Sequence, residues 1–414
     1  SADAPAVNVS LVGLTVAHSR PTYLDDYEAV SGGDWAFHRG GALKIENASG
    51  VTIMGCAFPA AGGNAVLLNG HVRSASILDS EFTKSGDSAI VALGYADGID
   101  GTGGRQPRGT LVKGCVMSDV GVFGKQSACF SQAIAMETTL EENLCYNLPR
   151  SGYNFNDHFG GGNTAKRNVI FNAVRETGDH GCINLWDRQP YSYDPAAPSN
   201  LVPRWSELDG NLLINNFHGC WPLCHDDGSN HWRNSRNVIL WGGQKSNMGH
   251  DLSFTSNLYV HPEVLGGGAV AGASWPRVCH LCNGAGKGES ETGNQSALCG
   301  TESFVNNSCV TANPSIYRMP CSVGADGRIQ RFDSEFQTFD PPWVGERAGT
   351  TLTAGNKLFV ANASAVNWPC GGAGNLSKAQ AAGEEVGSSV APIPSDGALV
   401  AMATALLREA GWPL

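Results

Sequence analysis

Three acidic motifs, each with a histidine beside an aspartate, are the residues of this 414-residue chain best suited to chemistry. They are "NDH" (156–158), "GDHG" (178–181) and "HDDGS" (225–229), and they contain Asp157, Asp179, Asp226 and Asp227. Two carboxyl groups hydrolyse a glycosidic bond when they lie about 5–5.5 Å apart, with retention of configuration, or about 6.5–9.5 Å apart, with inversion. The motifs therefore predict glycoside hydrolysis if the fold brings these acids together.

A recurring short strand predicts how they would be brought together. Similar β-rich segments are "VTIMGCAF" (51–58), "ASILDSEF" (75–82), "KRNVIFN" (166–172) and "SRNVILW" (235–241). Their spacing is 24 residues from Ile53 to Ile77, 25 from Asn143 to Asn168 and 26 from Asn211 to Asn237. Such a period, with glycine and asparagine at the corners and no helical periodicity, indicates a β solenoid. We expect an all-β, right-handed parallel β-helix with inserted loops.

The coil period turns sequence spacing into geometry, because neighbouring coils lie about 4.8 Å apart. Asp157 and Asp179 are 22 residues apart, close to one coil, and the interval from Asp179 to Asp226 contains an expected loop at 191–205. We expect Asp179 to act with Asp226 or Asp227, since like charges in proximity raise one pKa and create a general acid. Substrate contacts are expected from Asp157, His158, His180, Trp186, Arg188 and His225, with Trp221 as a second stacking candidate.

Other interpretations of the same residues stay open. The aspartates could simply cap turns, since Asp, Asn and Gly are turn residues for local reasons. A polyuronate lyase or epimerase would use calcium or a basic cluster, with Lys245 or His250 as base. Cys220, Cys224, Cys279 and Cys282 could form a zinc site, although disulfides fit their spacing better. We predict no metal and no cofactor for the hydrolase, and calcium only for the lyase or epimerase.

The sequence also predicts the corners of the coils, a second inserted loop and the C-terminal end of the solenoid. The asparagines expected to stack at one corner and hydrogen-bond from coil to coil are Asn143, Asn168, Asn211, Asn237 and Asn257. A second inserted loop is expected at 94–109. The β-helix is expected over 1–320, followed by an irregular Gly- and Cys-containing region over 321–414. The latter ends in a short helix at about 396–410, with Leu399, Met402 and Leu406 on one face, which docks on the solenoid or binds a partner.

The composition of the chain limits the cellular locations and the binding partners that can be expected for it. A net charge of −11 argues against binding nucleic acid through its phosphates, and no apolar run reaches the length of a membrane span. Thirteen cysteines favour an oxidising, extracellular location with disulfides, and their odd number leaves at least one cysteine unpaired within the chain. Six glycosylation sequons also favour an extracellular location, and they begin at Asn8, Asn47, Asn294, Asn306, Asn362 and Asn375. No signal peptide opens the sequence, so an upstream portion is expected to be missing.

The motifs "NDH", "DHG" and "HDDGS" resemble those on consecutive coils of extracellular β-helix proteins with the pectin-lyase-like fold, particularly their glycoside hydrolase branch. The resemblance covers about residues 130–262. Longer algal and fungal relatives are similar at "SGGDWAFHRG", "NFNDHFGGGN" and "WDRQPY". The resemblance to the glycoside hydrolase branch implies a polysaccharide substrate, with the paired acids at Asp179 and at Asp226 or Asp227. The alternative is a non-catalytic wall, sheath or appendage component on the same fold.

Overall fold

The computed structural model describes most of the chain and divides it into two compact units, Ser1–Glu207 and Leu208–Leu414. The described residues are 4–29, 35–95, 103–156, 160–177, 179–194, 197–215, 221–226, 228–247, 249–262, 279–283, 302–312, 317–318, 322–323, 329–330, 352–362, 364, 366–368, 372–373, 376–381, 383 and 385–414.

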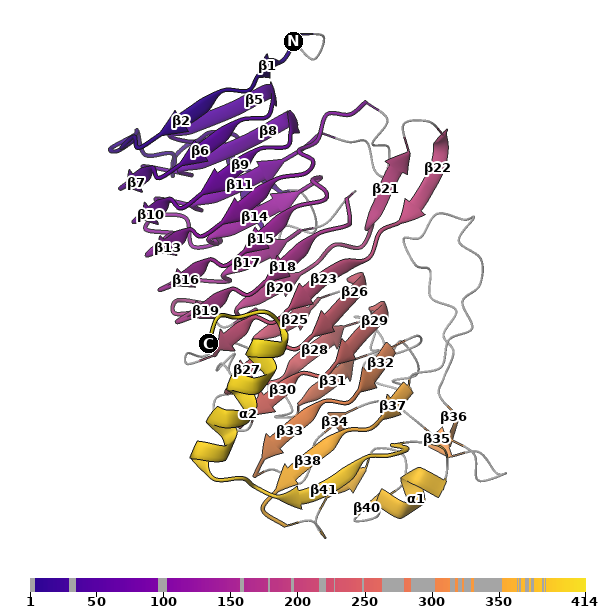
Figure 1. The fold of residues 1–414 in the computed structure, drawn as a ribbon. Coiled ribbons are helices and arrows are strands. Elements are labelled where there is room, and N and C mark those ends of the chain that lie inside the picture. Colours follow the sequence, from indigo (N-terminus) through magenta and orange to yellow (C-terminus); the bar gives the residue numbers. More distant parts are fainter. Residues whose placement is uncertain are drawn as a thin grey trace. The chain divides into compact units, whose positions relative to one another are not determined.

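In the first unit, strands of successive coils stack into three parallel sheets (Figure 1). Sheet A contains, in order, β1 (Ala6–Val7), β5 (Leu43–Ser49), β8 (Val66–Arg73), β11 (Ile90–Leu93), β14 (Phe130–Ala133), β17 (Tyr153–Phe155) and β20 (Ile183–Leu185). Sheet B contains β2 (Ser10–Val12), β6 (Thr52–Met54), β9 (Ser76–Leu78), β12 (Leu111–Lys113), β15 (Thr139–Glu141) and β18 (Thr164–Lys166). Sheet C contains β7 (Ala57–Pro59), β10 (Glu81–Thr83), β13 (Val116–Ser118), β16 (Leu144–Tyr146) and β19 (Val169–Phe171).

The second unit has the same kind of coil. One set of parallel strands is β25 (Leu223–His225), β28 (Gln244–Asn247), β31 (His280–Asn283) and β34 (Tyr317–Arg318). Another is β26 (Asn230–Ser235), β29 (His250–Thr255), β32 (Glu302–Val305) and β37 (Leu352–Ala354). The third is β24 (Leu212–Ile214), β27 (Val238–Leu240), β30 (Leu258–Val260), β33 (Ser308–Thr311), β38 (Lys357–Val360) and β41 (Ser389–Pro392). Strand β23 (Ser206–Asp209) contains the boundary between the units.

This strand order confirms the all-β, right-handed parallel β-helix, since each coil gives one strand to each of three parallel sheets. Among the described residues, four antiparallel pairs interrupt the coils: β3 (Glu28–Ala29) with β4 (Ala36–Phe37), β21 (Tyr191–Asp194) with β22 (Ala197–Pro203), β35 (Ser322–Val323) with β36 (Ile329–Gln330), and β39 (Asn367–Trp368) with β40 (Gly372–Ala373). The β21–β22 pair occupies the loop expected at 191–205. Within the loop expected at 94–109, the structure describes 94–95 and 103–109.

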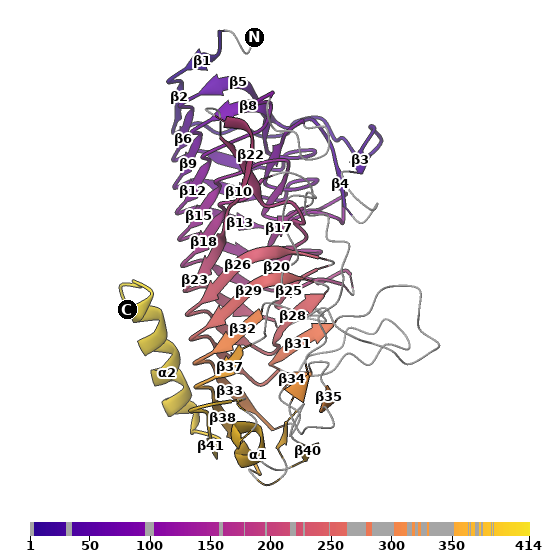
Figure 2. The ribbon, with the colours of Figure 1, turned by 90° about the vertical axis from the view of Figure 1, so that its right-hand side faces the viewer.

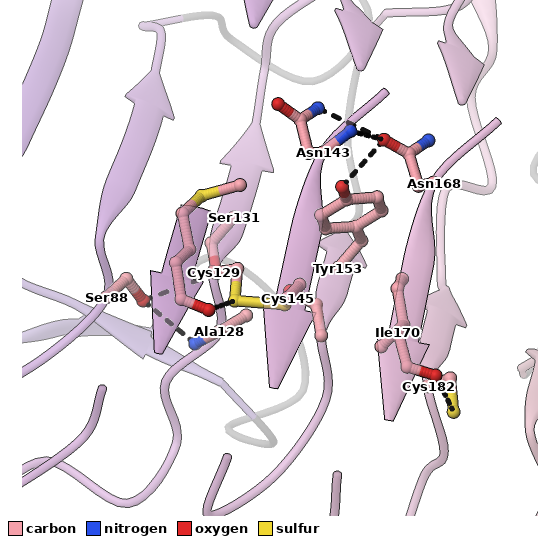
Figure 3. The surroundings of a disulfide bond; sticks show 12 residues. Ser88, Ala128, Cys129, Ser131, Asn143, Cys145, Tyr153, Asn168, Ile170 and Cys182 are labelled. Carbon is pink, nitrogen blue, oxygen red and sulfur yellow. Dashed lines mark hydrogen bonds between the residues drawn. A yellow bond between two sulfur atoms is a disulfide. The ribbon is translucent and has the colours of Figure 1, made fainter. Parts of the chain in front are cut away.

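The predicted asparagine corner is confirmed within each unit. In the first, Asn143 donates its backbone and side-chain N–H groups to Asn168 Oδ1, at 3.0 and 3.1 Å (Figure 3). In the second, the ladder runs from Asn211 to Asn237 and on to Asn257, Asn307 and Asn356 through backbone N–H donors at 2.8–2.9 Å. Each asparagine satisfies turn backbone that would otherwise be buried without a partner, so the ladder connects neighbouring coils.

Two disulfides confirm the prediction of disulfide bonding. Cys129 is bonded to Cys145 beside the asparagine corner (Figure 3), and Cys279 is bonded to Cys309. The Cys279–Cys309 bond excludes Cys279 as a ligand of the alternative zinc site, because a disulfide sulfur cannot bind the metal as a thiolate.

The thiol of Cys115 gives a first prediction. Cys115 is 1% exposed, and burial raises its pKa to about 11. Because only the thiolate is nucleophilic, Cys115 is expected to resist iodoacetamide at pH 8 in the folded protein and to react after unfolding in urea. Peptide mass spectrometry of the two samples measures this. Rapid alkylation of Cys115 in the folded sample would contradict the buried position.

The C-terminal helix packs on its own unit, as the docking alternative expected. Helix α2 (Asp396–Glu409) begins after Ser395, whose side chain accepts from Ala398 N–H, and it lies alongside β27 (Figure 1). Leu399 and Leu407 join the core of the second unit, with Met402 and Leu406 packed against it. Helix α1 (Leu376–Ala381) is shorter, and neither helix of the described residues has the length and apolarity needed to cross a membrane.

The domain boundary expected at residue 320 stays a prediction. On its C-terminal side, β37, β38 and β41 pair in parallel with one another or with strands of earlier coils.

Candidate functional site

A column of buried side chains, apolar on β8 and β11 and polar on β14, β17 and β20, lies on the outer face of sheet A in the first unit. The strand register aligns Leu67, Val91, Ser131, Asn154 and Asn184, one from each of β8, β11, β14, β17 and β20. Asn184 Nδ2 donates to Asn154 Oδ1 at 3.0 Å, and both side chains are fully buried. Their burial shows that another segment covers this face.

Trp35, just before β4, and Phe37, on β4, cover the apolar part of this face. Figure 2 shows β3 and β4 on the flank of the first unit. Both rings are buried against Leu67 and Val91 of the same column. Aromatic rings over aliphatic side chains bury enough area to hold such a hairpin in place. Trp186 belongs to the same cluster.

Asp179 lies at the edge of this covered face. Its side chain is 55% exposed, and its Oδ1 accepts from the backbone N–H of His180 at 2.9 Å. Arg150 Nη2 lies 3.8 Å from Asp179 Oδ2 and 2.5 Å from His180 Nε2. The Arg150 guanidinium carbon is 4.9 Å from the Trp35 ring centroid, and that ring stacks on His180 at 5.5 Å. The exposed Asp179 carboxylate thus lies next to a buried cluster of Arg150, His180 and Trp35.

Trp186 and Arg188 follow in the same segment. Trp186 is 7% exposed, and the Arg188 guanidinium carbon lies 5.3 Å from its ring centroid. A sugar that stacked on Trp186 would therefore have to displace Arg188 or part of the core cluster. Arg188 itself is half-buried and is the more accessible of the two.

A small pocket lies under the N-terminal segment of the first unit. Its volume is about 140 Å³, and its lining includes Tyr27, Phe37, His38, Asp87, Lys125 and Gln126. Asp87 Oδ2 accepts from the Tyr27 hydroxyl at 2.6 Å and from the Thr22 hydroxyl at 3.0 Å. Burial, and then the bond to Asp87, raise the pKa of Tyr27 above its ordinary value, so Tyr27 is a neutral donor.

Two contacts connect this pocket with the Asp179 turn. Phe37, which lines the pocket, packs in the cluster of Trp35 and Trp186. Lys125, which also lines it, pairs with Glu176 at 2.8 Å, three residues before Asp179. The pocket and the exposed carboxylate are thus parts of one surface region of the first unit.

In the second unit, Asp226 pairs with Lys245. The distance from Lys245 Nζ to Asp226 Oδ1 is 2.7 Å, and the two side chains are only 6% and 14% exposed. Register places Lys245 beside Cys224 on β28 and β25. A nearly buried ion pair costs desolvation, which marks Lys245 and Asp226 as functional candidates.

His225 is fully buried in the second unit. Its ring nitrogens lie 3.3 Å from Ser229 Oγ and 3.1 Å from Asn234 Oδ1, and its ring meets Phe254 edge-on at 5.4 Å. A contact between His225 and a sugar would need this packing to rearrange. Trp221 is 3% exposed. Asp157, His158 and Asp227 lie outside the described residues.

Sequence reasoning missed Trp35, Arg150, Tyr27 and Asp87. Trp35 stands in "GGDWAFHRG", whose sequence signal is a similarity to relatives, and Asp87 stands in "SGDSAI", an ordinary turn sequence. Arg150 lies 30 residues before His180, close to one coil. The coil period was the one signal that could have paired Arg150 with the "GDHG" motif.

No family model and no curated protein matches this chain. Among solved structures, a glycoside hydrolase matches 63% of this chain and 46% of its own length, at 13% identity and a TM-score of 0.46. The A-modules of the Azotobacter vinelandii mannuronan C-5 epimerases AlgE4 and AlgE6 match 94% and 95% of this chain, and 87% and 92% of their own. Their identities are 11% and 13%, and their TM-scores 0.48 and 0.46. The chain thus spans less than half of the glycoside hydrolase it matches.

Proposed function

We propose that this chain is a secreted, carbohydrate-active protein that hydrolyses a glycosidic bond in a wall or matrix polysaccharide. The proposed catalytic acids are Asp179 and either Asp226 or Asp227. The observation that carries the proposal is the exposed Asp179 carboxylate, supported from below by the buried side chains Arg150, His180 and Trp35. Catalytic groups act best when their supporting side chains are locked by packing and hydrogen bonds.

The pocket of the first unit supports a carbohydrate as ligand. It combines a carboxylate, Asp87, with a phenol, an amide and an ammonium group around one aromatic wall. Hydrogen-bonding groups beside an aromatic face suit a sugar ring, which is polar at its edge and apolar on its C–H faces. Contacts through Asp157, His158 and Arg188 are part of the same proposal.

Secretion rests on the cysteines and the sequons. The two disulfides fit an oxidising compartment. Asn8, Asn306 and Asn362 are exposed and Asn47 is half-buried, so glycans are proposed at these four positions. Asn294 and Asn375 are proposed from their sequons and lie outside the described residues.

A glycan panel tests the proposal. The purified full chain is incubated with neutral and uronate polysaccharides, and new reducing ends and ultraviolet absorbance are both followed. Hydrolysis gives new reducing ends without ultraviolet absorbance. Inactivity on every polysaccharide would contradict the hydrolase and favour the non-catalytic wall or sheath component.

The Lys245–Asp226 pair favours a second candidate, a polyuronate lyase or epimerase. These reactions remove the proton next to a uronate carboxylate, which needs a base and a cationic group that stabilises the developing charge. Lys245 could supply either, with Asp226 holding its ammonium group. In the same panel a lyase produces an unsaturated product that absorbs in the ultraviolet. An epimerase changes the uronate composition without chain cleavage, and a calcium requirement accompanies either activity.

A further inference from the structure

Two histidines and an aspartate converge on neighbouring strands of the second unit, apart from the acids proposed for glycan cleavage. They are His231 on β26, and His250 and Asp251 on β29. One ligand atom from each, a ring nitrogen or a carboxylate oxygen, lies within 4.8 Å of the others. The His231 and His250 rings meet edge-to-face with centroids 5.8 Å apart.

The backbone repeats the same kink on both strands. Register pairs Asn230 with His250 and Trp232 with Leu252, and between these pairs His231 and Asp251 both adopt left-handed φ values, 58° and 50°. This conformation is uncommon for residues with side chains. The matched kinks turn neighbouring side chains of two coils toward one place.

Hydrogen bonds of the imidazoles orient them for ligation. His231 Nδ1 lies 2.6 Å from Asn230 Oδ1, and His250 Nδ1 lies 2.7 Å from Asp251 Oδ2. For His250 the two facing atoms are themselves ligand atoms, so Nδ1 and Asp251 Oδ2 would bind the same ion in place of the proton between them. For His231 the Asn230 oxygen requires a proton on Nδ1, which puts the acceptor lone pair of that ring on Nε2. Metal-binding histidines commonly donate their other N–H to an oxygen in this way.

We propose that His231, His250 and Asp251 bind a Zn²⁺ ion. Two imidazoles and one carboxylate suit zinc, whereas calcium prefers six to eight oxygen ligands. Ligand distances of about 2.0–2.2 Å place tetrahedral ligand atoms roughly 3.3 Å apart. Closing from at most 4.8 Å therefore needs only small side-chain movements.

Burial and charge also suit a bound cation. His231 is 3% exposed, while the side chains of His250 and Asp251 are 14% and 21% exposed, so solvent reaches one side of the cluster. Three protein ligands with one open side are typical of zinc sites that keep a water ligand. The cluster does not include the acids proposed for glycan cleavage, so this proposal stands apart from the proposed function.

Metal binding to the full chain tests the site directly. The protein is purified without a histidine tag, stripped with a chelator, and titrated with Zn²⁺ by calorimetry, with metal content checked by mass spectrometry. We expect one saturable equivalent. Asp251→Asn and His231→Ala are each expected to weaken binding by at least about 100-fold, and Asn230→Ala, which removes the orienting acceptor but no ligand, by about 10- to 100-fold.

His71→Ala is the matched control, because His71 is a half-buried histidine of the first unit whose Nδ1 lies 3.1 Å from Gly104 O. It should bind zinc like the unaltered chain. Circular dichroism confirms folding, and Asp251→Asn, the mildest of the ligand changes, decides the result if His231→Ala does not fold. The absence of a saturable zinc site, or a site that persists unchanged in Asp251→Asn, overturns the proposal.

Discussion

Asp179→Asn is expected to lower glycan cleavage by about 10²- to 10⁴-fold, the range that a positioned acid–base group contributes, while folding stays intact. The amide retains the Oδ1 that accepts from His180 N–H, but it can neither carry the negative charge nor transfer the proton. The side chain is more than half exposed, so the free energy of unfolding should change by no more than about 0.5 kcal/mol. Initial rates on the glycan identified by the panel measure the effect.

Asp119→Asn provides the comparison for this change. Asp119 is also a turn aspartate of the first unit, has φ of 54° and accepts a hydrogen bond from Asn147 at 3.2 Å. It makes no part of the proposed site, so its variant should cleave at the unaltered rate. Equal rates for the Asp179 and Asp119 variants would remove Asp179 from the mechanism. The same pair of measurements on Asp226→Asn tests the second acid separately.

The coil architecture was predictable because its causes are local and repeated. Each coil needs β-branched or aromatic residues pointing inward and a corner residue that satisfies turn backbone, and both recur about every 25 residues. Asn143, Asn168 and Asn237 are therefore visible in sequence as a ladder, and the structure shows the hydrogen bonds they make. The C-terminal helix was predictable for a similar reason, since Ser395 and the Leu399 face are local signals.

The surroundings of Asp179 were only partly predictable, because they depend on segments without a period. Trp35 reaches His180 from the N-terminal hairpin, and no spacing rule connects these two residues. Trp35 and Phe37 of the same segment pack with Trp186 in one cluster, in which Trp186 is 7% exposed. Sequence identified Trp186 as a stacking surface because it could not show what packs on it. Asp87 was missed because a buried carboxylate in a pocket and a turn-capping aspartate have the same sequence.

Asn168→Ala is expected to destabilise the first unit by about 3 kcal/mol or more. Asn168 Oδ1 accepts from the Asn143 backbone, the Asn143 side chain and the Tyr153 hydroxyl, at 3.0–3.1 Å, and all three residues are buried (Figure 3). Leaving one buried donor unsatisfied costs about 1–3 kcal/mol. Burial raises the pKa of Tyr153 above its ordinary value, so its hydroxyl stays protonated. In the variant, this hydroxyl is therefore a buried donor without its acceptor. Urea unfolding measures the change.

Two further variants separate the ladder from ordinary losses of side-chain atoms. Tyr153→Phe removes one of the three donors and leaves Asn168 in place, so it should cost only about 1 kcal/mol. Lys166 lies on the same coil, and Lys166→Ala removes its partly buried ion pair with Glu141 at 3.3 Å. Glu141 keeps Lys113 and Arg167 as partners, so this loss should cost less than about 1 kcal/mol. If Asn168→Ala were no more damaging than Lys166→Ala, the corner asparagines would be a consequence of the coil stacking. The expected order, with Asn168→Ala largest, would make the corner asparagines one of the causes of the stacking, because the buried hydrogen bonds between corner asparagines of neighbouring coils are lost only in that variant.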